Sequence, residues 1–187
     1  MKKVLAGTFA SLMIFAPLHA MEIQGVSVPP TTQLGGETLR LNGAGLRTFS
    51  LLMIPIKIYV ASLYTPAEIR TDSGIMSSPG PMQFNFTFLR AVNQSDVTKA
   101  WESQFAESVS YTYPGYTRDR DAFIAMFGPL QKLGVEKVQL LGTNTVIFDQ
   151  GTQKGIIPGR DFQKAFLSLW FGANPVATDL RDALLGK

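Results

Sequence analysis

Alternating apolar and polar residues mark several short stretches of the chain, most clearly Met82–Leu89. This stretch carries a methionine and then three phenylalanines at every second position, with polar residues between them. Successive side chains of a β-strand point to opposite faces of a sheet, so the pattern predicts a strand with one buried face. Extended chain is predicted in the same way at Thr38–Leu41, Arg47–Leu52, Ile54–Thr65, Val135–Leu141 and Thr145–Phe148, with a short strand at Gly155–Ile157.

Other stretches follow the period of an α-helix. In Ser95–Ser108, apolar residues recur three and four positions apart, and Ser95 with Asp96 offers a cap for the helix. Gly128 and Pro129 are expected to break or kink a second helix near its end. The predicted helices after the first are Arg118–Lys132, Arg160–Phe171 and Pro175–Leu185, with a further short one at Ala67–Arg70.

Segments rich in glycine and proline separate these elements. Asn42–Gly45 reads Asn-Gly-Ala-Gly, which is typical of a turn, and we expect it to join the strands on either side. Gly142–Asn144 predicts the turn of a hairpin, and Pro66–Pro81 predicts a loop. Met21–Thr38 is predicted as a strand or a loop at the start of the domain.

The order of the elements indicates the fold class. Strands are followed by two helices, further strands and two more helices, which is typical of an α+β fold. We expect an antiparallel sheet with helices on one face. The chain shows no internal repeat, and its 45% hydrophobic content is sufficient for a packed core. The sequence therefore predicts a single domain over residues 21–187.

Residues 1–20 have the pattern of a secretory signal. Lys2 and Lys3 form a basic start, Val4–Phe15 is apolar, and Ala20 is a small residue at which a peptidase could cut. The alternative is a single membrane anchor, but the apolar run is short for a bilayer span. We expect a cleaved signal peptide, a periplasmic location and no membrane span after cleavage.

Cleavage at this point changes the chemistry available to the protein. The mature chain of about 167 residues would keep 15 basic and 14 acidic residues, a net charge of +1, and no basic cluster that suggests nucleic acid. It would lose His19, the only histidine, and the sequence has no cysteine. These losses exclude His-based and Cys-based nucleophilic sites, disulfides, and zinc or copper sites built on imidazole or thiolate. We predict no metal and no cofactor.

One cation stands out in the apolar segment Leu41–Tyr64. Arg47 and Lys57 are the only charged residues of this segment. An arginine in apolar surroundings needs an anion, because an unpaired buried guanidinium is strongly unfavourable. That anion is either a bound ligand or a structural carboxylate. The structural candidates are Glu102, Asp149 and Asp161.

The same segment carries a family resemblance. The Asn-Gly-Ala-Gly-Leu-Arg sequence of Asn42–Arg47, followed by the apolar Ile56–Tyr64, resembles the chalcone isomerase superfamily and, more narrowly, its bacterial exported chalcone isomerase-like branch. The resemblance implies an open-faced antiparallel β-sandwich with a layer of helices. Weaker support comes from Phe86–Arg90, Pro158–Phe162, Leu169–Gly172 and Leu184–Gly186.

The resemblance also implies positions for a site. The family's active-site arginine falls on Arg47, whereas its strand threonine falls on Tyr59. The polar residues of the family's first helix fall near Asp96, Lys99 and Ser103, where only the lysine matches. A late threonine or serine falls close to Leu169, which also departs from the family pattern.

These departures shape the predicted function. Losing one group that polarises a substrate ketone typically lowers a rate by about two to three powers of ten, so chalcone cyclisation is not the leading hypothesis. Other superfamily members bind fatty acids, and the resemblance implies that Arg47 with Tyr59 holds the carboxylate. We predict a non-catalytic protein that binds a small apolar ligand such as a fatty acid. The alternatives are an isomerase (an intramolecular lyase) acting on an enone or phenolic substrate through Arg47, Tyr59 and Lys99, and an accessory protein with a vestigial cleft.

Overall fold

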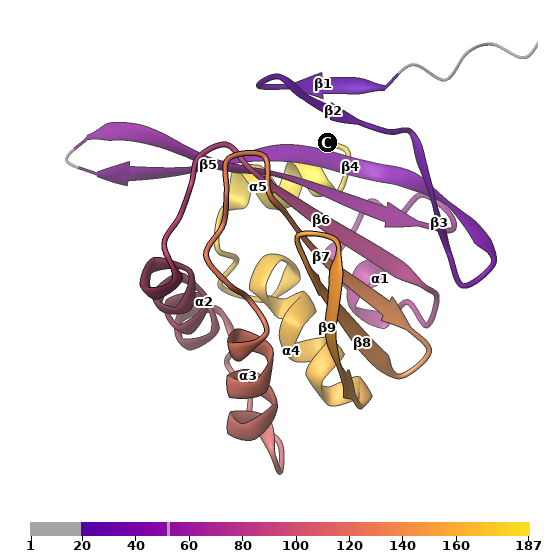
Figure 1. The fold of residues 1–187 in the computed structure, drawn as a ribbon. Helices are drawn as coiled ribbons and strands as arrows, with labels where there is room; N and C mark the ends of the chain where they lie inside the picture. Colours follow the sequence, from indigo (N-terminus) through magenta and orange to yellow (C-terminus); the bar gives the residue numbers. More distant parts are fainter. Residues whose placement is uncertain (1–19, 52) are drawn as a thin grey trace, which may run out of the picture.

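The computed structural model describes residues 20–51 and 53–187. Its main feature is a curled antiparallel sheet in which the strands from β3 to β9 lie side by side in the order of the sequence (Figure 1). A separate two-stranded ribbon, β1–β2, precedes the sheet. The strands are β1 (Met21–Ile23), β2 (Val26–Val28), β3 (Thr31–Leu34), β4 (Glu37–Leu51), β5 (Ile54–Thr65), β6 (Met82–Phe88), β7 (Val135–Leu141), β8 (Asn144–Asp149) and β9 (Thr152–Pro158).

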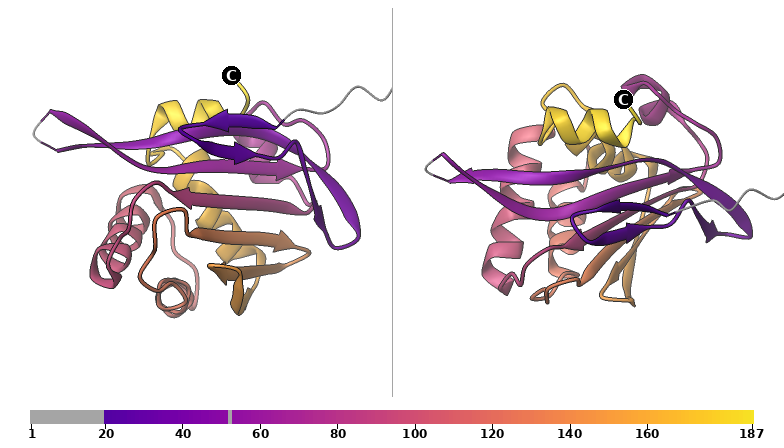
Figure 2. Two further views of the ribbon diagram at one scale, coloured as in Figure 1. Left: turned by 45° about the horizontal axis from the view of Figure 1, so that its top comes forward. Right: turned by 90° about the horizontal axis from the view of Figure 1, so that it is seen from above.

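The helices gather on one face of the sheet, and the β1–β2 ribbon lies on the other face (Figure 2). This arrangement confirms the predicted α+β class with helices on one side. Arg160–Phe171 and Val135–Leu141 have the predicted bounds. The helices are α1 (Asp72–Ser77), α2 (Gln94–Ser108), α3 (Tyr116–Ala125), α4 (Arg160–Phe171) and α5 (Thr178–Leu184).

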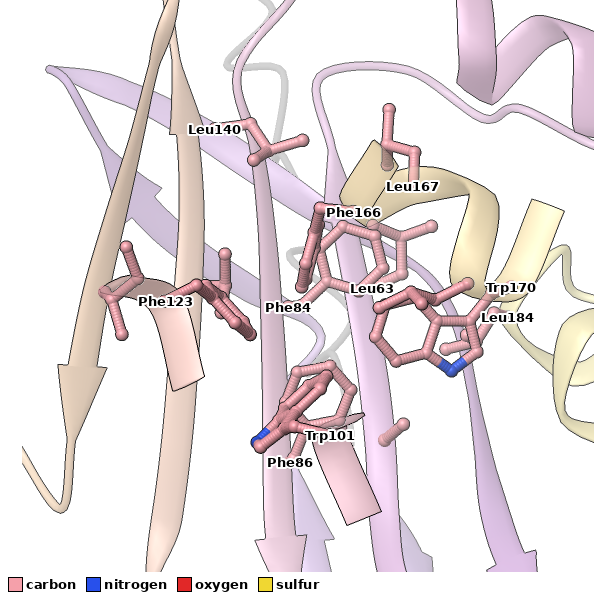
Figure 3. Packing of buried hydrophobic residues seen from close by; sticks show 14 of the residues in the cluster. Leu63, Phe84, Phe86, Trp101, Phe123, Leu140, Phe166, Leu167, Trp170 and Leu184 are labelled. Carbon is pink, nitrogen blue, oxygen red and sulfur yellow. The ribbon is translucent and has the colours of Figure 1, made fainter. Parts of the chain in front are cut away.

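A core rich in aromatic residues fills the space between the sheet and the helices (Figure 3). The apolar face of β6 supplies Phe84 and Phe86, and the ring of Phe86 stacks on Trp170 of α4 at 5.2 Å. Trp101 of α2 contacts Phe86 edge to face at 6.1 Å. The alternation in β6 therefore predicted the correct buried face. On the opposite side of the sheet, Val26 and Val28 of β2 pack against Leu39, Val60 and Tyr64.

The predicted turn at Asn42–Gly45 is wrong, because β4 runs through this segment, with a β-bulge at Asn42. The glycines allow the backbone of α5 to lie close against β4. A Cβ at Gly43 would collide with the backbone carbonyl oxygens of Ala183 and Leu184 near the end of α5. The side-chain amide nitrogen of Asn42, Nδ2, donates a hydrogen bond to the Leu184 carbonyl at 2.8 Å. These residues fasten the last helix to the sheet.

Asn42 also explains why the short helix predicted at Ala67–Arg70 is wrong. Its side chain accepts a hydrogen bond from the Ile69 amide at 2.7 Å and donates to the Ile69 carbonyl at 2.9 Å. This pairing occupies both backbone groups of Ile69. The helix begins later, at Asp72, where the Thr71 hydroxyl caps it by accepting from the Gly74 amide.

Two further helix boundaries differ from the prediction. Asn93, rather than Ser95 and Asp96, caps α2, and its side chain accepts from the Asp96 amide at 2.9 Å. The helix expected over Arg118–Lys132 ends at Ala125. Beyond it, Leu130 exchanges two backbone hydrogen bonds with Val92, and Pro129 cannot continue a helix.

The predicted signal segment, residues 1–20, lies outside the described residues except for its last position. Within the described ranges, the structure contains no helix that is both long enough and apolar enough to cross a membrane.

Candidate functional site

A cavity of about 670 Å³ lies between β4–β7 and helix α2. Its wall is largely apolar, and it carries three cations, Arg47, Arg90 and Lys99, together with the carboxyl groups of Asp96 and Glu136. Apolar side chains from the sheet line the space between them: Phe49, Ile56, Ile58, Phe86 and Phe88.

Arg47 and Tyr59 lie directly opposite each other on β4 and β5. A β-bulge follows at once, because Thr48 pairs with Lys57 and leaves Ile58 without a partner in this ladder. Bulges bend a strand and re-aim its side chains, and they are common beside functional sites. The sequence pattern did not predict this bulge. It occurs where β5 leaves its pairing with β6, which begins at Tyr59.

Arg47 is half-buried and lines the cavity. Its guanidinium donates to the Thr48 carbonyl, and no carboxylate of the described residues forms an ion pair with it. The alternative in which Glu102, Asp149 or Asp161 neutralises Arg47 is therefore not found among the described residues. Asp149 is instead 3.9 Å from the Lys154 ammonium.

Tyr59 is buried, and its ring packs against Phe86 and Phe88 with centroid distances of 5.4 Å. Burial raises the pKa of Tyr59 to about 12, although the positive charge of Arg47 and the nearby indole of Trp170 partly oppose the shift. The Trp170 indole lies near the Tyr59 hydroxyl, but its Nε1 atom forms no hydrogen bond with any described residue. The phenol stays protonated at neutral pH and can donate a hydrogen bond.

The helix positions indicated by the family resemblance also face this cavity. Asp96, Lys99 and Ser103 all line it from α2. Lys99 is exposed, whereas the Asp96 carboxylate accepts a hydrogen bond from the Asn93 side chain at 2.9 Å. Leu169 is fully buried in the core and is not part of the lining.

Sequence reasoning missed Glu136. This residue of β7 is fully buried, lines the cavity and lies directly opposite Asp149 of β8. Burial and the Asp149 carboxylate raise its pKa well above the usual value, and the Trp101 indole opposes this shift to a smaller extent. The alternation of Val135–Leu141 carried the signal, because Glu136 shares its phase with the core residues Val138 and Leu140.

The arrangement is suited to holding an amphiphilic anion. A half-buried guanidinium and a protonated phenol can both donate to one carboxylate, and the adjoining apolar wall can accept a hydrocarbon chain. Residues 20–51 and 53–187 include no group of three or more side chains of the kinds that hold metal ions.

Comparisons with known proteins place the fold. A family model described as chalcone isomerase-like matches residues 20–186. A fatty-acid binding protein from Arabidopsis thaliana superposes with a TM-score of 0.69 and 17% sequence identity, over 86% of this chain and 92% of that chain. At this identity the likeness establishes the fold alone. No curated protein matches the sequence.

Proposed function

The chain belongs to the chalcone isomerase-like family, and we propose that it is a non-catalytic member that binds a small apolar molecule with a carboxylate, such as a fatty acid. Arg47 holds the carboxylate in this proposal, Tyr59 donates a hydrogen bond to it, and the apolar wall contacts the chain. A structural neighbour described as a fatty-acid binding protein is consistent with the proposal.

The observation that carries the proposal is the state of Arg47. It is half-buried beside a largely apolar cavity and has no ion-pair partner among the described carboxylates. A guanidinium in such a position is stabilised by an anion that arrives with a ligand, and its planar donors match a carboxylate well. The cavity volume of about 670 Å³ is in the usual range for sites that bind small molecules.

The chemistry of Tyr59 supports binding over catalysis. A phenol with a pKa of about 12 remains a hydrogen-bond donor at neutral pH and is poorly suited to act as a base. Cyclisation of an enone requires several polar groups around the reacting atoms, and the residues at the family's corresponding positions depart from its pattern at Tyr59 and Leu169.

The proposal includes a periplasmic location and membership of the bacterial exported branch. Both rest on the basic start at Lys2 and Lys3, on the apolar run that follows and on the resemblance described above. Fractionation of cells that produce the full-length chain tests the location, since a cytoplasmic chain of uncleaved mass would contradict it.

The first experiment is native mass spectrometry of protein purified from cells, followed by delipidation and calorimetric titration with laurate and palmitate. We expect bound acyl species in the purified protein. Arg47→Ala should lower the palmitate affinity by about tenfold to a hundredfold, because it removes a charge-assisted contact.

Arg40→Ala is the matched control, because Arg40 is an exposed arginine of the same strand that does not line the cavity. It should bind palmitate as the unmodified protein does. An empty cavity together with no binding of either added fatty acid would refute the proposal. Faster loss of chalcone absorbance with the protein than without it, abolished by Arg47→Ala, would favour the isomerase alternative.

A further inference from the structure

The wall of the cavity contains buried polar atoms that no described residue satisfies. Neither carboxyl oxygen of Glu136 has a partner within hydrogen-bond geometry among the described residues, although the Trp101 indole lies close enough to lower the Glu136 pKa slightly. The side-chain oxygen of Gln104 and the Oδ1 atom of Asp149, which faces Glu136, lack a partner as well. Glu136 and Gln104 line the cavity, and Glu136 is 0% exposed. A buried polar atom without a partner is unfavourable, so such atoms beside a cavity point to a group that binds there.

The strands that carry Arg47 and Glu136 are not adjacent in the sheet. Arg47 belongs to β4 and Glu136 to β7, which are separated by three strand spacings, about 14 Å. Glu136 pairs directly with Phe86 of β6, whose ring faces the helices, so the Glu136 side chain lies on the same face of the sheet. Gln104 belongs to α2, on the opposite side of the cavity. The cavity wall therefore has unsatisfied polar atoms on its sheet side and on its helix side, apart from Arg47.

Glu136 is chemically suited to a neutral partner. Its buried position and the facing carboxylate of Asp149 keep it protonated, as its raised pKa indicates. A protonated carboxylic acid has one donor and remaining acceptor capacity, and the Gln104 oxygen is an acceptor. A hydroxyl group can pair with both kinds of atom, whereas a plain hydrocarbon chain would leave all of them unsatisfied.

We propose that the ligand of this cavity carries a second oxygen, a hydroxyl group remote from its carboxylate, and that Glu136 and Gln104 bind this hydroxyl. The inference rests on the proposed function, since it takes Arg47 as the site of the carboxylate. It narrows the ligand class from fatty acids in general to hydroxylated fatty acids and molecules of similar polarity.

The test compares oleate with ricinoleate, which differ by one hydroxyl in the middle of the chain. Calorimetric titration of the delipidated protein should show that ricinoleate binds about threefold to tenfold more tightly, the range expected for one net hydrogen bond. In Glu136→Leu, the ratio of the ricinoleate affinity to the oleate affinity should fall to about one. Glu136→Gln, which keeps hydrogen-bonding atoms, should retain part of the preference.

Glu102→Leu is the matched control, because Glu102 is an exposed glutamate of α2 that does not line the cavity. It should keep the full preference. Equal affinities of the unmodified protein for the two fatty acids, or a preference that survives Glu136→Leu, would overturn the inference. Binding of oleate without any preference leaves the proposed function intact, whereas binding of neither fatty acid refutes both.

An infrared measurement covers the case in which Glu136→Leu does not fold. The carbonyl band of the protonated Glu136 is the one that Glu136→Gln removes. Addition of ricinoleate should shift this band through a new hydrogen bond, and addition of oleate should not. A band that responds equally to both fatty acids, or to neither when both bind, would contradict a contact between Glu136 and the hydroxyl.

Discussion

At the scale of single residues, the account depends on a register. Arg47 and Tyr59 are paired across β4 and β5, and the bulge after Arg47 shifts the register of the ladder at that point. Their side chains therefore reach the same cavity from adjacent strands, one as a permanent cation and the other as a neutral donor. The family resemblance predicted both positions, but only the structure shows that no carboxylate of residues 20–51 and 53–187 forms an ion pair with Arg47.

The role of Tyr59 can be isolated by removing its hydroxyl alone. Tyr59→Phe keeps the ring that packs on Phe86 and Phe88. The palmitate affinity should fall by about threefold to tenfold, because one hydrogen bond to the carboxylate is lost. Calorimetric titration measures this change, and an unaltered affinity would remove Tyr59 from the site.

Tyr64→Phe provides the control for that measurement. Tyr64 lies on the same strand but packs on the other face of the sheet, where its hydroxyl donates to the Pro29 carbonyl at 3.0 Å. Its loss should lower the free energy of unfolding by about 1 kcal/mol and leave the palmitate affinity unchanged.

Glu136 should make the stability of the empty protein depend on pH. Its pKa is raised in the folded state, so above the ordinary glutamate pKa the folded protein holds a proton that the unfolded chain releases. The free energy of unfolding therefore falls as the pH rises from the ordinary glutamate pKa toward the raised pKa of Glu136 in the folded protein. Burial contributes most to this raised pKa, and the Asp149 carboxylate on the neighbouring strand adds to it.

Urea unfolding of the unmodified protein and of Glu136→Gln over this pH range measures the contribution. The variant has no proton to retain at this position, so its free energy of unfolding should fall less steeply with pH. Parallel pH profiles of the two proteins would show that Glu136 does not titrate differently on folding.

At the scale of elements, the sequence predicted the strands and helices whose apolar pattern follows a buried face. It did not predict the features that depend on contacts with distant parts of the chain. The alternation of β6 and the helical period of α4 reflect a buried face, so their existence and type could be predicted. Asn42–Gly45 has the composition of a turn, but the close approach of α5 explains its glycines. No local pattern reveals a contact with a helix about 140 positions later in the chain.

The contact between β4 and α5 makes a prediction of its own. Gly43→Ala should lower the free energy of unfolding by about 3 kcal/mol, because the added methyl group meets the backbone of Ala183 and Leu184 and neither strand nor helix can yield easily. Gly80→Ala is the comparison, since its new methyl group would have its nearest neighbour at 3.5 Å, an ordinary contact distance. Chemical denaturation measures the free energy of unfolding of both variants. Equal values would contradict a close approach of α5 to Gly43.

At the scale of the whole molecule, the cavity lies between the sheet and α2, beside an aromatic core. The order of the elements was enough to predict the α+β class and the layer of helices. The cavity itself required the pairing of four strands and the placement of one helix, which the chain does not encode locally. Its charged and polar wall residues come from positions as distant as Arg47, Lys99 and Glu136. Glu136 in particular is recognisable in the sequence only once the buried phase of β7 is known.

The most direct test of the central claim observes the ligand's carboxylate. Palmitate labelled at its carboxyl carbon can be bound to the delipidated protein and followed by nuclear magnetic resonance as the pH is lowered. A neighbouring guanidinium favours the ionised form, so the pKa of the bound carboxyl group should be lower in the unmodified protein and in Arg40→Ala than in Arg47→Ala. The same pKa in the unmodified protein and in Arg47→Ala would contradict the claim that Arg47 holds the carboxylate.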